Sequence, residues 1–145
     1  MEIVKTNTYQ PLHLTEAQKS HISSPTRIMT ALQQPDCIGF YAKESTETIG
    51  FALLRNYADG EYFLWNFIID YKYQGQGKGK LFLQLLLNML QQEYDAKMLT
   101  TTYTYGNDTA QKLYESFGFV QTDVVQEGDI HEVNMALALT FKEDA

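Results

Sequence analysis

The fold of this chain is decided by Tyr73-Gln74-Gly75-Gln76-Gly77-Lys78-Gly79-Lys80, a glycine-rich stretch in the middle of the sequence. It follows the apolar run Tyr62-Phe63-Leu64-Trp65-Asn66-Phe67-Ile68-Ile69 and precedes a segment of helical periodicity that reaches Asp95. Where a strand passes into a helix through glycines, free backbone N–H groups and the positive end of the helix dipole converge. The stretch therefore predicts an anion-binding loop, and its three glycines suit a pyrophosphate.

Two other phosphate-binding loops fit this stretch poorly. A P-loop needs Gly-Lys followed by Ser or Thr, but Gly79 follows Lys78 and Leu81 follows Lys80, so the magnesium-binding hydroxyl is missing. A dinucleotide fingerprint needs another glycine three positions after the second, and an acidic residue after the next strand, where residues 102–105 stand instead. The remaining alternative is an ordinary tight turn at the start of a helix.

The residues before the loop predict an antiparallel meander. Apolar runs over residues 37–43, 48–56 and 61–70 are separated by short, turn-rich stretches, which is typical of strands linked by hairpins. The third run is apolar on both faces, as a central strand covered on each side would be. Residues 3–8 predict an opening strand.

Two short surface helices are predicted between the opening strand and the meander. The first covers residues 15–21, with Thr15 as its cap. The second covers residues 25–33, where Ser24 is followed by a proline, the residue preferred at the first helical position.

The residues after the loop predict a βαβ crossover. The helix that reaches Asp95 connects the meander to a strand over residues 98–104, so this strand and the one before the loop should be parallel. Residues 107–116 predict a further helix, and residues 120–126 and 130–139 predict two final strands. The long helix should bury a stripe against the sheet, formed by Leu81, Phe82, Leu85, Leu86, Met89 and Leu90.

The composition narrows the classes of function. The chain has 145 residues, 44% of them apolar, which suits one domain over residues 1–145. Its net charge of -7 disfavours nucleic acid or an anionic membrane as partner. The single cysteine, Cys37, excludes a disulfide framework and a CxxC site, and we expect no metal. Because we find neither a signal peptide nor a membrane span of roughly 20 apolar residues, we expect a cytoplasmic protein.

Two motifs resemble the GNAT superfamily of N-acetyltransferases. Gln74-x-x-Gly77-x-Gly79 has the form of its acetyl-coenzyme A signature, in which Arg or Gln precedes Gly-x-(Gly or Ala). Downstream, Asn107 precedes Ala110-Gln111-Lys112-Leu113-Tyr114-Glu115-Ser116-Phe117-Gly118-Phe119, which is similar to the family's Asn followed by A-x-x-L-Y-x-x-x-G-F. The resemblance covers residues 37–139. It implies an α/β (α+β) fold with a mixed, mostly antiparallel sheet of six to seven strands, a parallel, splayed central pair and flanking helices.

The resemblance also implies where acetyl-coenzyme A binds. Backbone N–H groups of the loop would hold its pyrophosphate, and the cleft between the splayed strands would take its pantetheine arm. A backbone N–H near a bulge around residues 67–69 would polarise the thioester carbonyl, and Asn107 would face the pantetheine or an ordered water. The implied cofactor-binding residues are Phe67, Ile68, Ile69, Gln74, Gly75, Gln76, Gly77, Lys78, Gly79, Lys80, Asn107, Lys112 and Tyr114.

Tyr114 is the candidate general acid, because the equivalent tyrosine of the family points at the sulfur of coenzyme A. A phenol with a pKa of about 10 is protonated at neutral pH and can donate to the departing thiolate. The alternative is a tyrosine that only packs its helix against the sheet. For the base that the acceptor amine needs, Asp70 is our first candidate beside Glu61 and Asp36, although Asp70 could equally cap or brace the loop.

The acceptor is expected to be a small-molecule amine. The segments around both motifs are most similar to bacterial spermine/spermidine (diamine) acetyltransferases, and an acidic chain suits a polycation. Other small amines, such as amino acids, aminoglycoside-like compounds or amino sugars, and protein N-termini or lysines stay open, with Trp65 and Asn66 as candidate wall residues of the acceptor pocket. A non-catalytic acyl-coenzyme A sensor and a nucleotide-binding protein are the alternatives outside catalysis, and a homodimer is an option.

Overall fold

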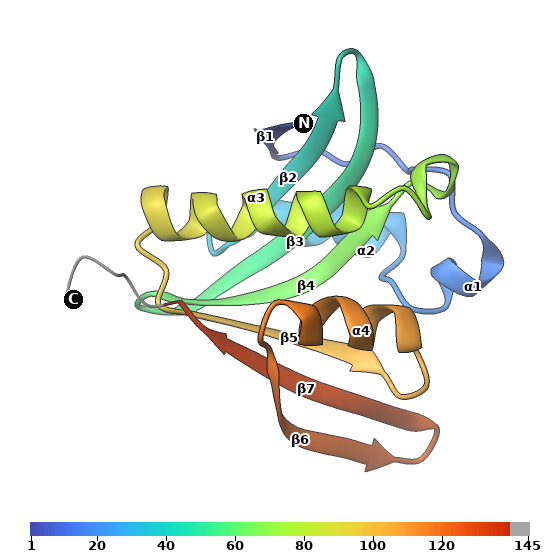
Figure 1. Cartoon of the computed structure of the whole chain (residues 1–145), viewed down its shortest axis with the longest axis vertical. Helices are drawn as coiled ribbons and strands as arrows, with labels where there is room; N and C mark the ends of the chain where they lie inside the picture. The colour runs from blue at the N-terminus through green and yellow to red at the C-terminus, as the bar shows by residue number, and fades with distance from the viewer. Residues whose placement is uncertain (140–145) are drawn as a thin grey trace.

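A computed structural model of the chain describes residues 1–139, and its centre is one seven-stranded sheet (Figure 1). The strand order is β1-β2-β3-β4-β5-β7-β6, and only the β4–β5 pair is parallel. The predicted mixed, mostly antiparallel sheet is therefore confirmed. The strands are β1 (Glu2–Thr6), β2 (Cys37–Glu44), β3 (Glu47–Ala58), β4 (Glu61–Ile69), β5 (Met98–Thr104), β6 (Val120–Glu127) and β7 (Ile130–Ala138).

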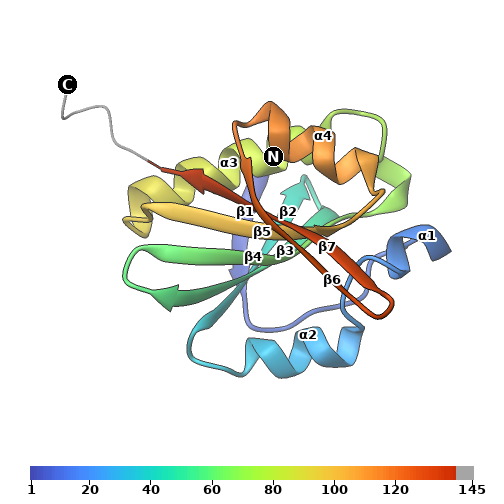
Figure 2. The same cartoon turned by 90° about the horizontal axis from the view of Figure 1, so that it is seen from below.

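Helices cover both faces of the sheet (Figure 2). The long helix α3 (Lys78–Glu93) and α4 (Asp108–Ser116) lie on one face, and α2 (Pro25–Leu32) lies on the other. Two shorter turns, α1 (Glu16–Lys19) and the 3-10 helix η1 (Tyr71–Tyr73), lie in the connections. Two apolar cores result, one under α3 and α4 and one under α2.

Helices α1 and α2 begin at their predicted caps, and α4 is capped by Asn107, which was predicted as a cofactor-binding residue and not as a cap. The Thr15 side chain accepts from the backbone N–H of Gln18 and Gln18 reciprocates, which closes a capping box at α1. Ser24 accepts from Arg27 N–H at α2, and Asn107 accepts from Ala110 N–H at α4. Each cap satisfies an amide that the helix leaves without an internal partner, so these starting points follow from local sequence.

The apolar stripe of α3 is rotated from its predicted position. The buried residues of this helix are Phe82, Leu83, Leu86, Leu87 and Leu90, whereas Leu81 is exposed. A run of three leucines at 85–87 is compatible with either choice of face. The helix begins at Lys78 with Gly77 as its N-cap.

The parallel pair β4–β5 separates along its length. Pairing runs from Glu61 opposite Met98 to Leu64 opposite Thr101 and stops there, although both strands continue. Next to this point, the pairing of β3 with β4 shifts register, leaving Trp65 as the extra residue on β4. The expected bulge around residues 67–69 thus lies two residues earlier. It turns Asn66 toward α2 and returns Phe67 to the α3 face, because a single inserted residue reverses the alternation of a strand.

Candidate active site

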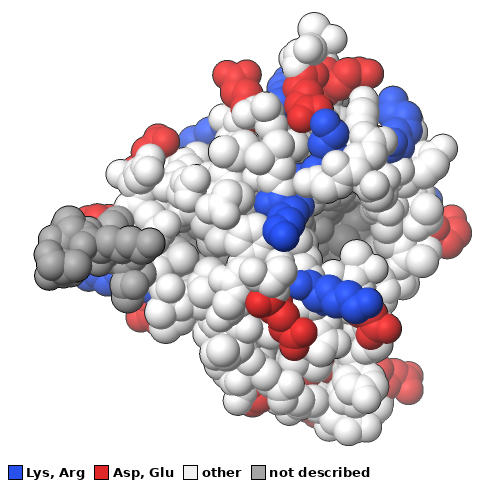
Figure 3. Space-filling view, viewed as in Figure 1, with Lys and Arg blue, Asp and Glu red and all other residues white. Residues whose placement is uncertain are grey.

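A cleft of about 460 Å³ opens where β4 and β5 separate. Its walls come from the connection between α1 and α2, from β4 and β5, and from α4, with Glu132 of β7 at one side. On the face of α3 and α4, Figure 3 shows a hollow with Lys or Arg side chains at its rim. The cleft therefore lies where the two parallel strands of the sheet diverge.

Tyr114 reaches this cleft from α4. The residue is only 6% exposed, and its phenol lies beside the side chain of Thr101. Thr101 in turn donates its hydroxyl to the carbonyl oxygen of Leu64 at 3.0 Å, the position where strand pairing ends. Burial raises the pKa of the Tyr114 phenol, so the group holds its proton at neutral pH. The geometry suits a proton donor fixed at the point where the strands diverge.

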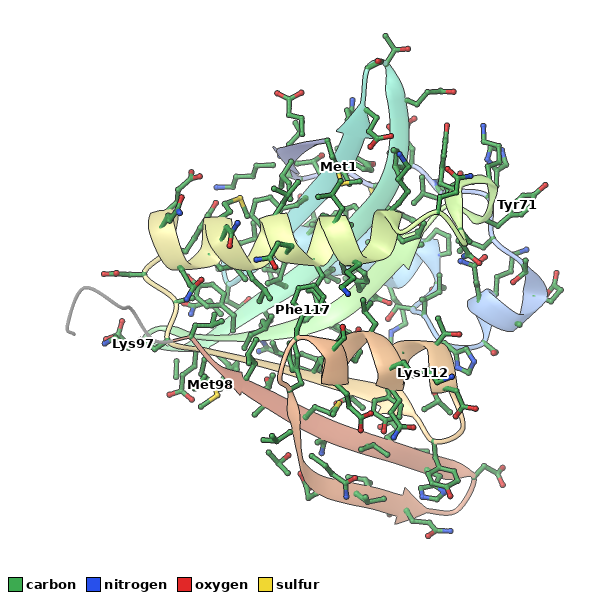
Figure 4. All side chains as sticks on the ribbon, viewed as in Figure 1. Met1, Tyr71, Lys97, Met98, Lys112 and Phe117 are labelled. Carbon is green, nitrogen blue, oxygen red and sulfur yellow. The ribbon has the colours of Figure 1, made fainter. Side chains whose placement is uncertain are left out.

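The start of α4 contributes two more predicted residues. Asn107 lines the cleft and uses its side-chain oxygen to cap the helix, accepting from Ala110 N–H at 3.2 Å. Lys112 is exposed on the same helix (Figure 4), and it forms no ion pair with any of residues 1–139. Asn107 is thus part of the cleft wall, and Lys112 lies on the outer surface of α4.

The glycine loop presents backbone amides and not side chains. Gly75 and Gly77 both have φ of 75°, and a Cβ placed on either would meet nothing within 4 Å. The N–H groups of residues 75–80 have no acceptor in the described part of the chain. Unpaired amides at a helix N-terminus, with open space before them, are a site for an anion. The observed geometry fits a diphosphate.

The side chains of the loop brace it from behind. Gln74 donates to the carbonyl oxygen of Ile69 at 3.1 Å, and Gln76 donates to that of Lys72 at 3.2 Å. Lys78 pairs with Glu44 of the β2–β3 hairpin at 2.6 Å. Lys80 is exposed. The predicted loop residues therefore divide into amides that face a ligand and side chains that hold the loop in shape.

The three predicted residues at the end of β4 have different surroundings. Phe67 lines the cleft and stacks on Phe82 of α3, with ring centroids 5.0 Å apart. Ile68 is buried on the opposite face, in the core under α2. Ile69 lies outside the cleft lining, and its carbonyl oxygen accepts from Gln18 at 2.9 Å. Of the three, Phe67 is the one whose side chain reaches the cleft.

Asp70 lies outside the cleft. Its side chain is buried and accepts from the backbone N–H of Lys72 at 3.0 Å, and from both the N–H and Nδ1 of His13 at 3.1 Å. Burial acts to raise the pKa of this carboxyl, but the hydrogen bonds from Lys72 and His13 outweigh it and the pKa is lowered. Asp70 therefore caps η1 and ties the N-terminal segment to the end of β4.

The other two candidate bases also lie outside the cleft lining. Asp36 pairs with Arg55 at 2.9 Å, and the hydrogen bond from Arg55 lowers the pKa of Asp36. Glu61 begins β4 at the end where the strands are still paired. The cleft instead contains a carboxylate that sequence reasoning missed, Glu132, together with a second buried phenol, Tyr103. Alternate burial along β5 places Thr101 and Tyr103 on one face, which is the pattern that could have identified Tyr103.

Neither a metal cluster nor a membrane-crossing helix occurs in the described part of the chain. No group of three or more potential metal ligands from His, Cys, Asp and Glu is found in residues 1–139. Within the same residues, no helix combines the length and the apolar character that crossing a membrane requires.

Comparison with known proteins identifies related sequences. Residues 6–119 match the model of the acetyltransferase (GNAT) family. The spermine/spermidine N(1)-acetyltransferase of Bacillus subtilis (strain 168) is 30% identical over 120 residues, which are 74% of this chain and 76% of that protein.

Solved structures share the fold. The ribosomal-protein-S18-alanine N-acetyltransferase from Escherichia coli superposes with a TM-score of 0.73 at 20% identity, covering 97% of this chain and 96% of that one. A GNAT family acetyltransferase from Elizabethkingia anophelis, solved with acetyl-CoA bound, gives a TM-score of 0.71 at 18% identity and covers 94% of this chain and 98% of that one.

Proposed function

The chain belongs to the acetyltransferase (GNAT) family and is an acetyl-coenzyme A-dependent N-acetyltransferase, and on that premise we propose how it works. Acetyl passes directly to a primary amine within a ternary complex, and Tyr114 serves as the general acid. The observation that carries this proposal is the buried phenol of Tyr114, which lines the cleft where β4 and β5 diverge. A tyrosine that only packed its helix would not need to line a cleft.

The unpaired amides of residues 75–80 would hold the diphosphate of acetyl-coenzyme A. Its pantetheine arm would then follow the cleft between β4 and β5, past Phe67 and Asn107. Acetyl-coenzyme A supplies an activated thioester. The protein supplies orientation, since the loop and the cleft together fix both ends of a long, flexible molecule.

The transfer itself needs two proton movements. The acceptor nitrogen attacks the thioester carbon, a C–N bond forms, and the C–S bond breaks. The electron pair left on sulfur takes the proton of Tyr114, and the proton lost by the acceptor nitrogen returns to the phenol through the open cleft. Burial disfavours a phenolate, so reprotonation of Tyr114 is favourable. Asp70 takes no part in this scheme, because its oxygens already accept hydrogen bonds from Lys72 and His13.

Relatives provide the first indication of the acceptor. The curated relative from Bacillus subtilis is a spermine/spermidine acetyltransferase, which supports a polyamine, whereas the superposed protein from Escherichia coli acetylates an alanine of a ribosomal protein. Acceptor pockets are built on a common fold and are not fixed by it. A polyamine is therefore the first acceptor to be assayed.

The test is release of free thiol from acetyl-coenzyme A with a panel of amines. The panel contains spermidine, diamines, amino acids, an amino sugar and a peptide with a free N-terminus. We expect thiol to form with at least one class and to match the acetylated amine found by mass spectrometry. Binding of acetyl-coenzyme A without thiol release by any amine would indicate a non-catalytic sensor and contradict the proposal.

A further inference from the structure

Arg27 is a cation at the edge of the cleft that has no role in the proposed transfer. Arg27 stands in the first turn of α2, where its backbone N–H is fixed by Ser24 Oγ at 3.2 Å. Its side chain is exposed, and its guanidinium forms no hydrogen bond and no ion pair with any of residues 1–139. Its backbone is therefore held, and its guanidinium is free to bind a ligand.

Arg27 belongs to two cavities at once. It lines the cleft that holds Tyr114, and it lines a second cavity of about 480 Å³ beneath α2. Trp65, the extra residue of the β4 bulge, is the other residue shared by both linings. The two spaces therefore adjoin at Arg27 and Trp65, which form a junction between them. An acceptor whose amine lies in the cleft can extend across this junction.

The segment that precedes Arg27 is hydrogen-bonded to β4 at the cleft, through Asn66. Asn66 is 4% exposed and lines the cleft, and its side-chain oxygen accepts from the backbone N–H of Ser23 at 2.9 Å. Its amide nitrogen donates to Ser23 Oγ at 3.1 Å. A buried amide with both ends paired fixes the backbone it holds. The bulge that turns Asn66 toward α2 thus sets the distance between Arg27 and the cleft.

The charges around the junction are not those of a polycation site. In the described residues that line the two cavities, the carboxylates are Asp36 and Glu132. Asp36 is paired with Arg55 at 2.9 Å, which leaves Glu132 as the one other carboxylate among the described lining residues, and Arg27 without an ion-pair partner among them. With histidine counted as neutral, the two arginines and two carboxylates of the linings balance, whereas the net charge of the whole chain is -7. A guanidinium without a partner favours a carboxylate or phosphate.

We infer that the acceptor carries an anionic group, a carboxylate or a phosphate, bound by Arg27 while its amine lies beside Tyr114. This inference rests on the proposed acetyl transfer and departs from the polyamine suggested by the relatives. The carbon chain between the two groups lies against Trp65. Arg27 is then a specificity-determining residue, and discrimination arises from the charge at the far end of the acceptor.

The test compares amines that differ only at that far end. Pentylamine, diaminopentane and ω-aminopentanoate share a chain and a reacting amine but end in methyl, ammonium and carboxylate, and shorter and longer series vary the reach. We expect the carboxylate series to contain the best acceptor, with kcat/KM about tenfold or more above its methyl counterpart. A preference for the ammonium end would overturn the inference and support a polyamine.

Variants then test whether Arg27 causes the preference for amines that end in a carboxylate. Arg27→Gln should bring the carboxylate and methyl amines to the same kcat/KM, with the constant for acetyl-coenzyme A unchanged. Lys5→Gln, an equal change of charge on the exposed part of β1, should keep the preference. A carboxylate preference that survives in Arg27→Gln would refute the assignment.

A separate readout distinguishes this inference from the proposed function. If no amine gives thiol, the proposed acetyl transfer fails, and calorimetry with ω-aminopentanoate still decides whether Arg27 binds an anion. Binding that is lost in Arg27→Gln upholds the anionic site. Equal binding by both proteins, or no binding by either, rejects it.

Discussion

Tyr114 bears the proton of the proposed reaction, and its replacement by phenylalanine keeps the ring while removing that proton. Because a positioned general acid contributes about 100-fold or more to rate, Tyr114→Phe should lower kcat by about that factor. The affinity for acetyl-coenzyme A should change little, since the group acts mainly in the transition state. Steady-state kinetics with the best amine of the panel and calorimetry with acetyl-coenzyme A measure the two effects.

The matched variant is Tyr103→Phe, because Tyr103 is a second buried phenol in the same cleft and burial raises its pKa too. It should keep most of the activity. If instead Tyr103→Phe is the slow variant and Tyr114→Phe is normal, the acid is Tyr103 and the assignment changes.

Asp70 leads to a prediction about stability and not about turnover. Its pKa is lowered in the folded state, so its stabilising effect is present above the ordinary carboxyl value near 3.8 and is lost as pH falls through the lower, folded value. At neutral pH, Asp70→Asn should reduce the free energy of unfolding by about 1–3 kcal/mol, because the backbone N–H groups of His13 and Lys72 lose a buried, charged acceptor.

Denaturant unfolding across acidic pH checks this prediction. The difference in free energy of unfolding between wild type and Asp70→Asn should become smaller as the wild-type carboxylate becomes protonated. A difference of equal size at every pH would show that the charge of Asp70 is not what stabilises the fold. A kcat reduced without loss of stability would revive Asp70 as the base.

Some single residues could be predicted from the sequence and others could not. Tyr114 and Asn107 belong to one sequence motif that forms a single helix and its cap, so both could be predicted as site residues from the sequence. The surroundings of Asp70 depend on His13, 57 positions away. Arg27 and Glu132 reach the cleft only through the packing of α2 and β7. Contacts between distant segments leave no local pattern, and this is why the surroundings of Asp70 and the lining of the cleft could not be predicted.

At the scale of elements, the loop before α3 makes a prediction about cofactor binding. A side chain at Gly77 would occupy the open space in front of the unpaired amides. Gly77→Val should raise KM for acetyl-coenzyme A by about tenfold, a loss of about 1.4 kcal/mol, with kcat at saturation less affected. Initial rates at varied acetyl-coenzyme A measure the effect.

Gly128→Val is the matched control for this variant. Gly128 also has a positive φ, at 60°, and a Cβ placed on it would meet nothing within 4 Å, but it lies in the β6–β7 turn. Both variants share the strain of a side chain at positive φ. An equal rise of KM in both would mean that strain, and not blocked phosphate, is responsible.

The boundaries of most elements followed from the sequence, because caps and turns are local. The strand at Met98–Thr104 and the caps Thr15 and Ser24 agree with the structure. The bulge at Trp65 was expected too late in the strand. A run that is apolar on both faces carries no alternation, and a shift of one residue cannot be detected in it.

At the scale of the whole molecule, the parallel arrangement of β4 and β5 was predicted because a helix connects them. The sheet order β5-β7-β6 at the other end involves a strand inserted between neighbours in sequence. The site depends on both features, since the parallel pair opens the cleft and the inserted β7 contributes Glu132.

Binding of the co-substrate should stabilise this whole assembly, since the loop, both central strands and α4 would all contact one molecule. At 100 times its dissociation constant, acetyl-coenzyme A should add about 2.7 kcal/mol, which for a chain of this length corresponds to a rise in Tm of about 9 °C. ATP and NAD should cause a smaller rise, because neither combines the diphosphate with a pantetheine arm that fills the cleft. Thermal unfolding of wild type and Gly77→Val with each ligand measures this, and the variant should lose most of the rise. Equal stabilisation by NAD, with none by acetyl-coenzyme A, would assign the loop to a nucleotide and remove the basis for acetyl transfer.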